Sequence, residues 1–414
     1  MKKAPRGKSK KKRLNTLIQL KRGLRTGGAT TVKYTRGLMG RFNEFTTGQS
    51  RAGQSTRRWM TFSRLIAGTA ALLVLLMLMM DNRNVDVERI TLSVPGLGRE
   101  LEGYTILHLS DLHGATFGAG QSMLRNTLDS LSYNMAILSG DMVGAGGDPQ
   151  PLYDLLDGLR AGRPTYFVAG DSDPAALLGE PRDVVGSLRE HVLADWILGA
   201  EQHGAQYLDA PTALAVGNAR IWLTPDSMLN LNASLEMERI TNEAKAQEDA
   251  VIEGDAAARG TLARAAYRKD ILTRLSEAIK AMDAGDLHIA VGHVPPAAGY
   301  LNSAAVLSAQ NAEDVASYLQ PVDLALAGHY CGGQWKLPFA GALYIPAPEA
   351  ARHGWFPAQG DVEGIRLLGG TALYVNGGLG ATDRIYLPRF RLFNTPKVAL
   401  ITLTSSLTDD LLGG

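Results

Sequence analysis

The stretch Tyr104-Thr105-Ile106-Leu107-His108-Leu109-Ser110-Asp111-Leu112-His113-Gly114 decides the fold of this chain. It begins as a short apolar run, which predicts a buried β-strand. The strand ends in Asp111 and His113, which can converge on one metal ion where the chain turns. A carboxylate beside an imidazole suits Zn, Mn or Fe. An ordinary turn at a strand end can also carry Asp-x-His, so this pair alone does not establish a metal site.

Four later apolar runs end in the same way. The residues that follow them are Asp141, Asp171, His293 and His329, and Cys331 lies two residues after the last of these. A glycine directly precedes each of the four. Glycine permits unusual backbone angles and close approach, which a tight strand-to-loop turn needs. Five strand ends that carry Asp or His therefore predict one shared metal site rather than five unrelated turns.

With these motifs the chain resembles the calcineurin-like metallophosphoesterases, whose pattern is D-x-H, G-D, G-N-H-[DE], G-H and G-H-x-H. The corresponding segments here are Asp111-Leu112-His113, Gly140-Asp141, Gly170-Asp171-Ser172-Asp173, Gly292-His293 and Gly328-His329-Tyr330-Cys331. Gly332-Gly333-Gln334 and Asn376-Gly377-Gly378-Leu379-Gly380 are similar to the bacterial membrane-anchored branch. Alternating strands and helices predict an α/β fold. The resemblance implies two sheets packed face to face with helices outside, over residues 85–414.

The resemblance also implies a site for two divalent metal ions, which would be Mn, Zn or Fe. Asp111, His113, Asp141 and Cys331 would hold the first ion, and Asp141, Asp171, His293 and His329 would hold the second. Two such ions can share a hydroxide that attacks phosphorus. The resemblance therefore implies hydrolysis of a phosphomonoester or phosphodiester, with Ser172 as a substrate contact.

Three positions differ from the family pattern. Asp171 replaces an Asn, Ser172 replaces a His, and Cys331 replaces a His. Three carboxylates and a thiolate would cancel the charge of two divalent ions and so weaken the attraction for phosphate. The alternative hypothesis is therefore a metal-binding pseudoenzyme that acts as an envelope scaffold or interaction protein. The other histidines match no motif and are interpreted as structural or surface residues: His108, His191, His203, His288 and His353.

The N-terminal part of the chain differs sharply in charge from the rest. Residues 1–58 hold 17 Lys and Arg and a single acidic residue, whereas the rest holds 25 basic and 40 acidic residues. This arm has too few apolar residues for a core, which predicts disorder. We interpret it as a charged flank, and a nucleic-acid partner is disfavoured.

Residues 59–80 are predicted to form a transmembrane anchor. Leu65 to Met80 contains no charged residue, and with Trp59, Met60 and Phe62 the segment approaches the ~20 residues that a spanning helix needs. The basic arm precedes this segment, which places the arm in the cytoplasm and residues 85–414 outside the cell membrane. That location suggests a lipid-linked or cell-wall-derived phosphate ester as substrate.

Residues 232–286 interrupt the alternation of strands and helices with an Ala-, Glu-, Arg- and Lys-rich insertion. Its pattern predicts two helices, about Ser234–Ile252 and Leu262–Met282, with breaks at Gly254 and Gly260. The insertion is either an exposed helical hairpin without chemistry, or a cap over the site or a surface for a partner. Elsewhere the pattern predicts strands at Val87–Val94, Ala213–Val216, Arg220–Leu223, Ala342–Ile345, Thr371–Asn376 and Val398–Leu403, and helices at Gln121–Leu131, Pro149–Leu159 and within Pro174–Leu198.

Overall fold

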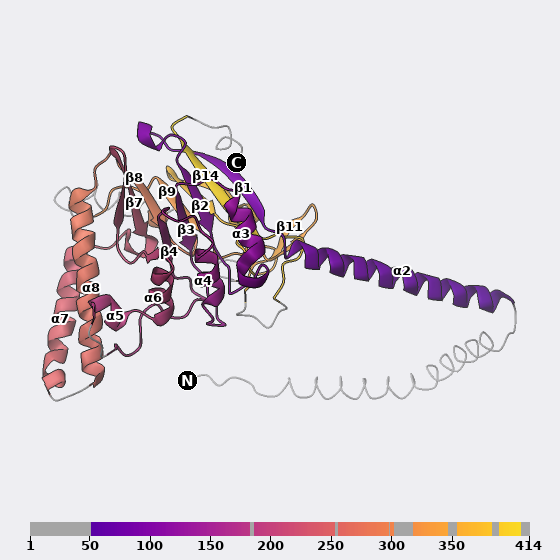
Figure 1. The fold of residues 1–414 in the computed structure, drawn as a ribbon, viewed down its shortest axis with the longest axis horizontal. Helices are drawn as coiled ribbons and strands as arrows, with labels where there is room; N and C mark the ends of the chain where they lie inside the picture. Colours follow the sequence, from indigo (N-terminus) through magenta and orange to yellow (C-terminus); the bar gives the residue numbers. More distant parts are fainter. Residues whose placement is uncertain are drawn as a thin grey trace, which may run out of the picture. The chain divides into compact units, whose positions relative to one another are not determined.

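The computed structural model describes residues 51–182, 186–252, 256–297, 299–301, 318–346, 354–382 and 389–406. By internal contacts the chain divides into two units, Met1–Leu75 and Leu76–Gly414. The predicted arm lies largely outside the described residues, and so do Gly254 and His353. The folded body belongs to the second unit (Figure 1).

The first of two large sheets has six strands in the order β1-β14-β2-β3-β4-β5. Their bounds are β1 Asp86–Ser93, β14 Lys397–Thr404, β2 Thr105–Leu109, β3 Met135–Ser139, β4 Thr165–Val168 and β5 Ala205–Tyr207. Strands β2 to β5 are parallel, while β14 runs antiparallel to β2 and parallel to β1. The last strand of the chain therefore lies inside this sheet.

The second sheet also has six strands, in the order β12-β13-β9-β8-β7-β6. Their bounds are β12 Gly364–Leu368, β13 Thr371–Val375, β9 Leu324–Ala327, β8 Leu287–Val291, β7 Ala219–Pro225 and β6 Thr212–Val216. The four central strands are parallel, and the two outer strands are antiparallel to their neighbours. A separate hairpin pairs β10 Trp335–Leu337 with β11 Gly341–Tyr344.

The main core lies between the two sheets. Ile106 and Ile137 of the first sheet belong to one buried cluster with Leu223, Ile289 and Leu326 of the second. Alternate residues along a strand point to opposite faces, so Leu107 and Leu138 face the other way and pack under helices. The implied arrangement of two sheets flanked by helices is thus observed, and the strands are buried on both faces, as their continuous apolar runs require.

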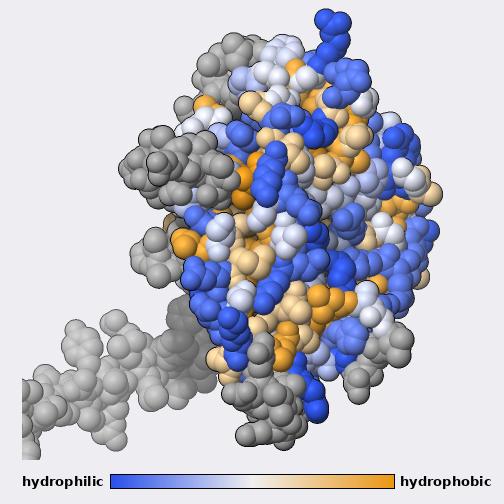
Figure 2. Space-filling model, turned by 90° about the vertical axis from the view of Figure 1, so that its left-hand side faces the viewer, coloured by the Kyte–Doolittle hydropathy of each residue, from blue (hydrophilic) through white to orange (hydrophobic). Residues whose placement is uncertain are grey.

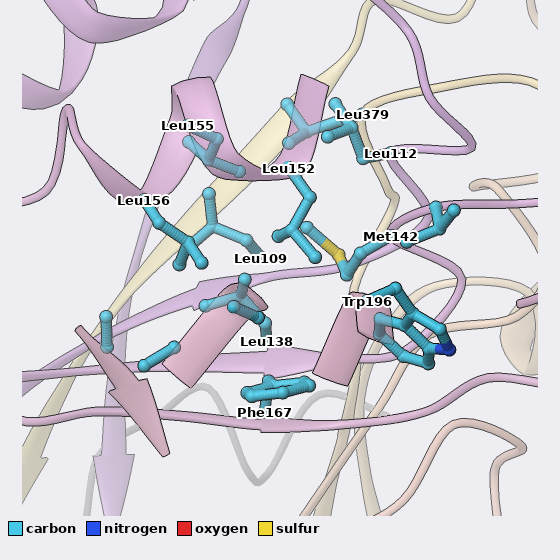
Figure 3. Packing of buried hydrophobic residues seen from close by; sticks show 14 of the residues in the cluster. Leu109, Leu112, Leu138, Met142, Leu152, Leu155, Leu156, Phe167, Trp196 and Leu379 are labelled. Carbon is cyan, nitrogen blue, oxygen red and sulfur yellow. The ribbon is translucent and has the colours of Figure 1, made fainter. Parts of the chain in front are cut away.

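Short helices cover the outer face of the first sheet. They are α3 Ser122–Asp129, α4 Gln150–Leu156, α5 Leu188–Val192 and α6 Asp195–Gln202. Figure 3 shows Leu152 of α4 pointing toward Met142 of the loop that follows β3. Leu155 of α4, Leu112 and Leu379 belong to the same buried cluster. The described residues from Pro174 to Arg182 are not helical, so the predicted helical stretch is shorter than expected.

The insertion forms two long helices, α7 Ala233–Ile252 and α8 Ala256–Ala281. The predicted break at Gly260 is wrong: Gly260 lies inside α8 and packs against Pro181, since a side chain there would contact that ring. Leu272 and Leu275 of α8 pack with Trp222 of β7, so the hairpin lies on the second sheet. Figure 2 faces the side where Figure 1 draws these helices, and much of this surface is hydrophilic.

The predicted transmembrane segment falls within α2, a helix that covers Arg51–Asp81. Where the side chains of α2 are described, Trp59, Phe62 and Leu65 are exposed. Among the described residues, however, no helix is long and apolar enough to cross a membrane. The structure therefore does not show the predicted span. That residues 59–80 anchor the chain in a membrane stays a prediction.

Candidate metal centre

The parallel strands of both sheets end at one site. Asp111 and Asp141 follow β2 and β3, while His293 and His329 follow β8 and β9. The backbone links these ends directly, because the Asp111 N–H donates to the Gly140 carbonyl (3.0 Å) and the Gly328 N–H donates to the His293 carbonyl (2.9 Å). Loops at the carboxyl ends of strands in two facing sheets thus bring the sequence motifs together.

Asp111, His113 and Cys331 form one group of ligand atoms, all within 4.8 Å of one another. The Cys331 Sγ lies 3.5 Å from His113 Nε2 and 3.8 Å from Asp111 Oδ1. All three residues are buried. Cys331, one of the three positions that depart from the family pattern, therefore has its sulfur where a ligand of the first ion is expected.

Asp171, His293 and His329 form a second group, and their ligand atoms also lie within 4.8 Å of one another. His293 Nε2 lies 3.1 Å from Asp171 Oδ1, and His329 Nδ1 lies 3.4 Å from the same oxygen. The side chain of Asp171 is 41% exposed, whereas that of His293 is only 4% exposed. The site therefore opens to solvent at Asp171.

Asp141 stands between the two groups. Its Oδ2 lies 3.6 Å from His113 Nε2 and 3.1 Å from His293 Nε2. Its Oδ1 accepts a hydrogen bond from the Ser172 backbone N–H at 2.7 Å. One carboxylate oxygen is fixed by the backbone, and the other faces both groups, as a bridging ligand requires.

Five of the candidate ligands adopt positive φ angles, a conformation that is uncommon outside glycine and that clusters at functional sites. They are Asp111 (52°), His113 (48°), Asp141 (53°), His329 (81°) and Cys331 (48°). The glycines that precede the ligands chiefly allow other ligand side chains to approach the backbone closely. A Cβ on Gly328 would lie 2.5 Å from Asp111 Oδ2, and one on Gly140 would lie 2.8 Å from His293 Nδ1.

Burial and the charges of neighbouring ligands shift the pKa values of the candidate ligands. Burial by itself would raise the pKa of Asp141, but the hydrogen bond and charge of His293 outweigh it and lower that pKa to about 2. The pKa of Asp171 is lowered for the same reasons by His293 and His329. Burial raises the pKa of the Cys331 thiol well above its usual range, and Asp111 adds to this effect. A cation would be needed to displace that proton at neutral pH.

The donor set fits a bound cation. His293 donates from Nδ1 to the Ser139 carbonyl oxygen at 2.9 Å, so Nε2 is the nitrogen left to bind a metal. Nε2 faces the carboxylates of Asp141 and Asp171, and a metal ion would take the place of its proton there. A carbonyl holding the far nitrogen is also the usual support for a ligating histidine. Three carboxylates, three imidazoles and one thiol suit borderline transition metals.

Ser172, the expected substrate contact, is buried. Its backbone N–H donates the hydrogen bond that fixes the Asp141 carboxylate. The neighbouring Asp173 has a structural role that the sequence did not reveal. Its carboxylate accepts hydrogen bonds from the N–H groups of Val143 (2.7 Å), Gly144 (2.9 Å) and Gly170 (2.8 Å). Asp173 therefore ties the loop after β3 to the loop after β4.

Arg391 is a second supporting residue, and no sequence motif marks it. It is 1% exposed, and its guanidinium donates to the carbonyls of Gly377 (2.7 Å), Gly380 (2.8 Å) and Asn394 (2.8 Å). The Gly380 N–H in turn donates to the Asp111 carbonyl at 2.6 Å. Arg391 thus holds the Asn376–Gly380 loop against the first group.

The histidines outside the motifs lie where a structural or surface role predicts. His108 is fully buried, with Nε2 2.8 Å from the Ser139 hydroxyl. His288 is buried against Thr224, at 2.9 Å between Nε2 and Oγ1. His191 and His203 are partly exposed.

Comparison with known proteins identifies the class. Residues 104–332 match the calcineurin-like phosphoesterase family, and the chain belongs to that family of metal-dependent phosphoester hydrolases. It is 39% identical over 88 residues to the uncharacterized metallophosphoesterase YkuE of Bacillus subtilis. That match spans 21% of this chain and 26% of the relative, so it covers only about a quarter of the relative's length.

Among solved structures, the phosphopantetheinyl hydrolase PptH of Mycobacterium tuberculosis aligns with 67% of this chain and 91% of its own, at 14% identity and a TM-score of 0.31. The sulfate thiohydrolase SoxB of Thermus thermophilus aligns with 73% of this chain and 57% of its own, at 10% identity and a TM-score of 0.30. At these scores neither structure adds to the argument from the family and the site.

Proposed function

We propose that this protein hydrolyses a phosphomonoester or phosphodiester at a centre of two divalent metal ions. The observation that carries the proposal is the position of Asp141 Oδ2, which faces His113 at 3.6 Å and His293 at 3.1 Å. Asp111, His113 and Cys331 would hold one ion, Asp171, His293 and His329 the other, and Asp141 both. When bound, such ions supply Lewis-acid activation of water and neutralise charge on the phosphoryl group.

The protein's own groups would orient the reaction. The partly exposed Asp171 marks the side from which a phosphate ester would enter. Ser172, whose backbone fixes Asp141, would place its hydroxyl as a hydrogen-bond donor toward the phosphate. A serine is a poor acid near neutral pH, so the leaving group would take its proton from another source. This requirement favours esters whose leaving group departs readily.

The test compares full-length protein with Asp141→Asn, supplied with Mn²⁺, by elemental mass spectrometry and by hydrolysis of bis(p-nitrophenyl) phosphate and p-nitrophenyl phosphate. We expect about two ions per chain in the wild type, fewer in the variant, and a loss of activity of at least about 100-fold. Asp129→Asn, which changes an exposed carboxylate on α3, should alter neither quantity. Two bound ions without turnover of either ester would instead favour the pseudoenzyme that acts as a scaffold.

We also propose that residues 59–80 anchor the chain in the cell membrane, with residues 85–414 outside the cytoplasm and a lipid-linked or cell-wall-derived ester as substrate. The uncharged run from Leu65 to Met80 and the exposed Trp59 and Phe62 on α2 support this. Full-length protein should stay in the membrane fraction after a carbonate wash, and protease added to spheroplasts should remove the folded body. A body protected in intact spheroplasts would contradict the orientation.

A further inference from the structure

A cavity of about 290 Å³ adjoins the second ligand group. Gly292 and His293 line it from the end of β8, and Tyr267 and Ile271 line it from α8. The insertion is therefore not only an exposed hairpin, because one face of α8 forms a wall beside a candidate metal ligand. Any group attached to a phosphate at His293 would have this cavity next to it.

The cavity has the composition of a site for a small organic group. Apolar parts of its lining come from Val168, Ala169, Leu177, Pro225 and Ile271. Polar side chains line the rest of the cavity, and they are Tyr207, Asp209, Asp226, Ser227, Tyr267 and His293. Its volume lies at the lower end of the range for small-molecule sites, which are mostly apolar with a few placed polar groups. These features suit the organic part of an ester better than the phosphate itself.

Two carboxylates line the cavity, and their surroundings differ. Asp209 accepts hydrogen bonds from Arg274 at 2.8 Å and from the Tyr267 hydroxyl at 2.5 Å, and it is also paired with Arg189. Its charge is therefore balanced within the protein. Asp209 holds α8 in place and is not available to a ligand.

Asp226 is the other carboxylate, and among the described residues no Lys or Arg pairs with it. Its carboxylate accepts a hydrogen bond from the Ser227 backbone N–H and packs against Gly292, where a Cβ would collide with it. Three carboxylates and a thiolate at the metal centre would already balance two divalent ions. His293 offsets part of the charge of Asp226, and a cation on a bound ligand would pair with this carboxylate.

We propose that this cavity binds the organic group of the phosphate ester, and that this group combines a small apolar body with a protonated amine that pairs with Asp226. The proposal rests on the proposed phosphoesterase function and deepens it. It makes α8 a specificity-determining wall of the substrate site. It also gives the substrate a positive charge, which offsets the weakened attraction of an anion-rich centre for phosphate.

The experiment measures binding rather than turnover. Three non-hydrolysable ligands are titrated by calorimetry into the full-length protein with Mn²⁺: methylphosphonate, phenylphosphonate and 4-(aminomethyl)phenylphosphonate. We expect the phenyl group to increase affinity about tenfold over methyl, by burial of apolar surface. The amine should add about another tenfold, by pairing with a partly buried carboxylate.

Two variants separate these contributions. Asp226→Asn, which keeps the side-chain shape, should abolish the gain from the amine and retain the gain from the phenyl group. Ile271→Trp should fill the cavity and abolish both. Glu277→Trp places the same large side chain at an exposed position of α8 and should abolish neither.

Equal binding of phenylphosphonate and methylphosphonate by the wild type would overturn the cavity as the organic-group site. An amine gain that survives in Asp226→Asn would overturn the role of Asp226. If none of the three phosphonates binds the metal-loaded protein, the proposed phosphoesterase function itself fails. That outcome differs from tight but unselective binding, which would leave the proposed function standing and reject only this inference.

Discussion

At the residue scale, backbone angles and hydrogen bonds orient the candidate ligands. The Asp111 carboxylate accepts hydrogen bonds from the Ser110 hydroxyl at 2.5 Å and from the His329 N–H at 3.0 Å. Its backbone is fixed by Gly140 and Gly380. These hydrogen bonds orient the buried carboxylate toward His113 and Cys331, as supporting contacts around a metal ligand do.

His108, three residues before Asp111, makes the fold sensitive to acid. Burial lowers its pKa to about 3, whereas an unfolded histidine titrates near 6.5. Between these values the unfolded chain binds a proton that the folded chain does not. The free energy of unfolding is therefore not reduced by His108 well above pH 6.5, and it falls as the pH drops from there toward 3. His108→Gln keeps a polar contact to Ser139 and does not titrate.

Between pH 6 and pH 5 we therefore expect the free energy of unfolding of the wild type to fall by about 1.2 kcal/mol more than that of His108→Gln. Urea unfolding at pH 7.5, 6.0 and 5.0 gives this slope for both proteins. The slope is the readout because the substitution also changes packing, which shifts stability at every pH. Parallel slopes would show that His108 is not the group that titrates.

At the element scale, the sequence predicted where strands end far better than how the ends are supported. The strand ends at Asp111, Asp141, Asp171, His293 and His329 could be predicted because buried strands leave apolar runs and the turns need glycine. The support could not be predicted, since Arg391 and Asp173 act on backbone groups that are distant in sequence. No local pattern marks such contacts.

The insertion shows the same limit. Its two helices follow from composition, but the break expected at Gly260 does not occur, because a single glycine costs a helix only about 1 kcal/mol and packing of α8 outweighs that. The ion pairs of Asp209 with Arg189 and Arg274, which join α8 to the first sheet's edge, have no signature in the sequence. A cap over the site was one of the alternatives that the sequence left open, but the cavity that α8 lines beside His293 could not be inferred from it.

At the scale of the whole molecule, the two ends of the folded body depend on each other. Strand β14, Lys397–Thr404, pairs with β1 along all eight of its residues and also pairs with β2. It therefore lies between β1 and β2, the strand that leads to Asp111. Such pairing between distant parts of a chain cannot form until the chain is complete.

A chain that ends at Pro396 should therefore fail to fold, although every candidate metal ligand is still present. It would lose Val398, Ile401 and Leu403, which are fully buried. At about 1.5–3 kcal/mol for each buried side chain, the loss approaches the roughly 5–15 kcal/mol that stabilises a typical domain. Removal of β14 would also leave the edges of β1 and β2 without their partner.

A chain that ends at Ser406 keeps β14 and is the matched control. We expect it to express as soluble or detergent-soluble protein, to unfold cooperatively on heating and to bind Mn²⁺ as the full chain does. The chain ending at Pro396 should aggregate and show no cooperative transition. Cooperative unfolding with normal metal content in that shorter chain would mean that the first sheet forms without β14, contrary to the pairing of this strand with both β1 and β2.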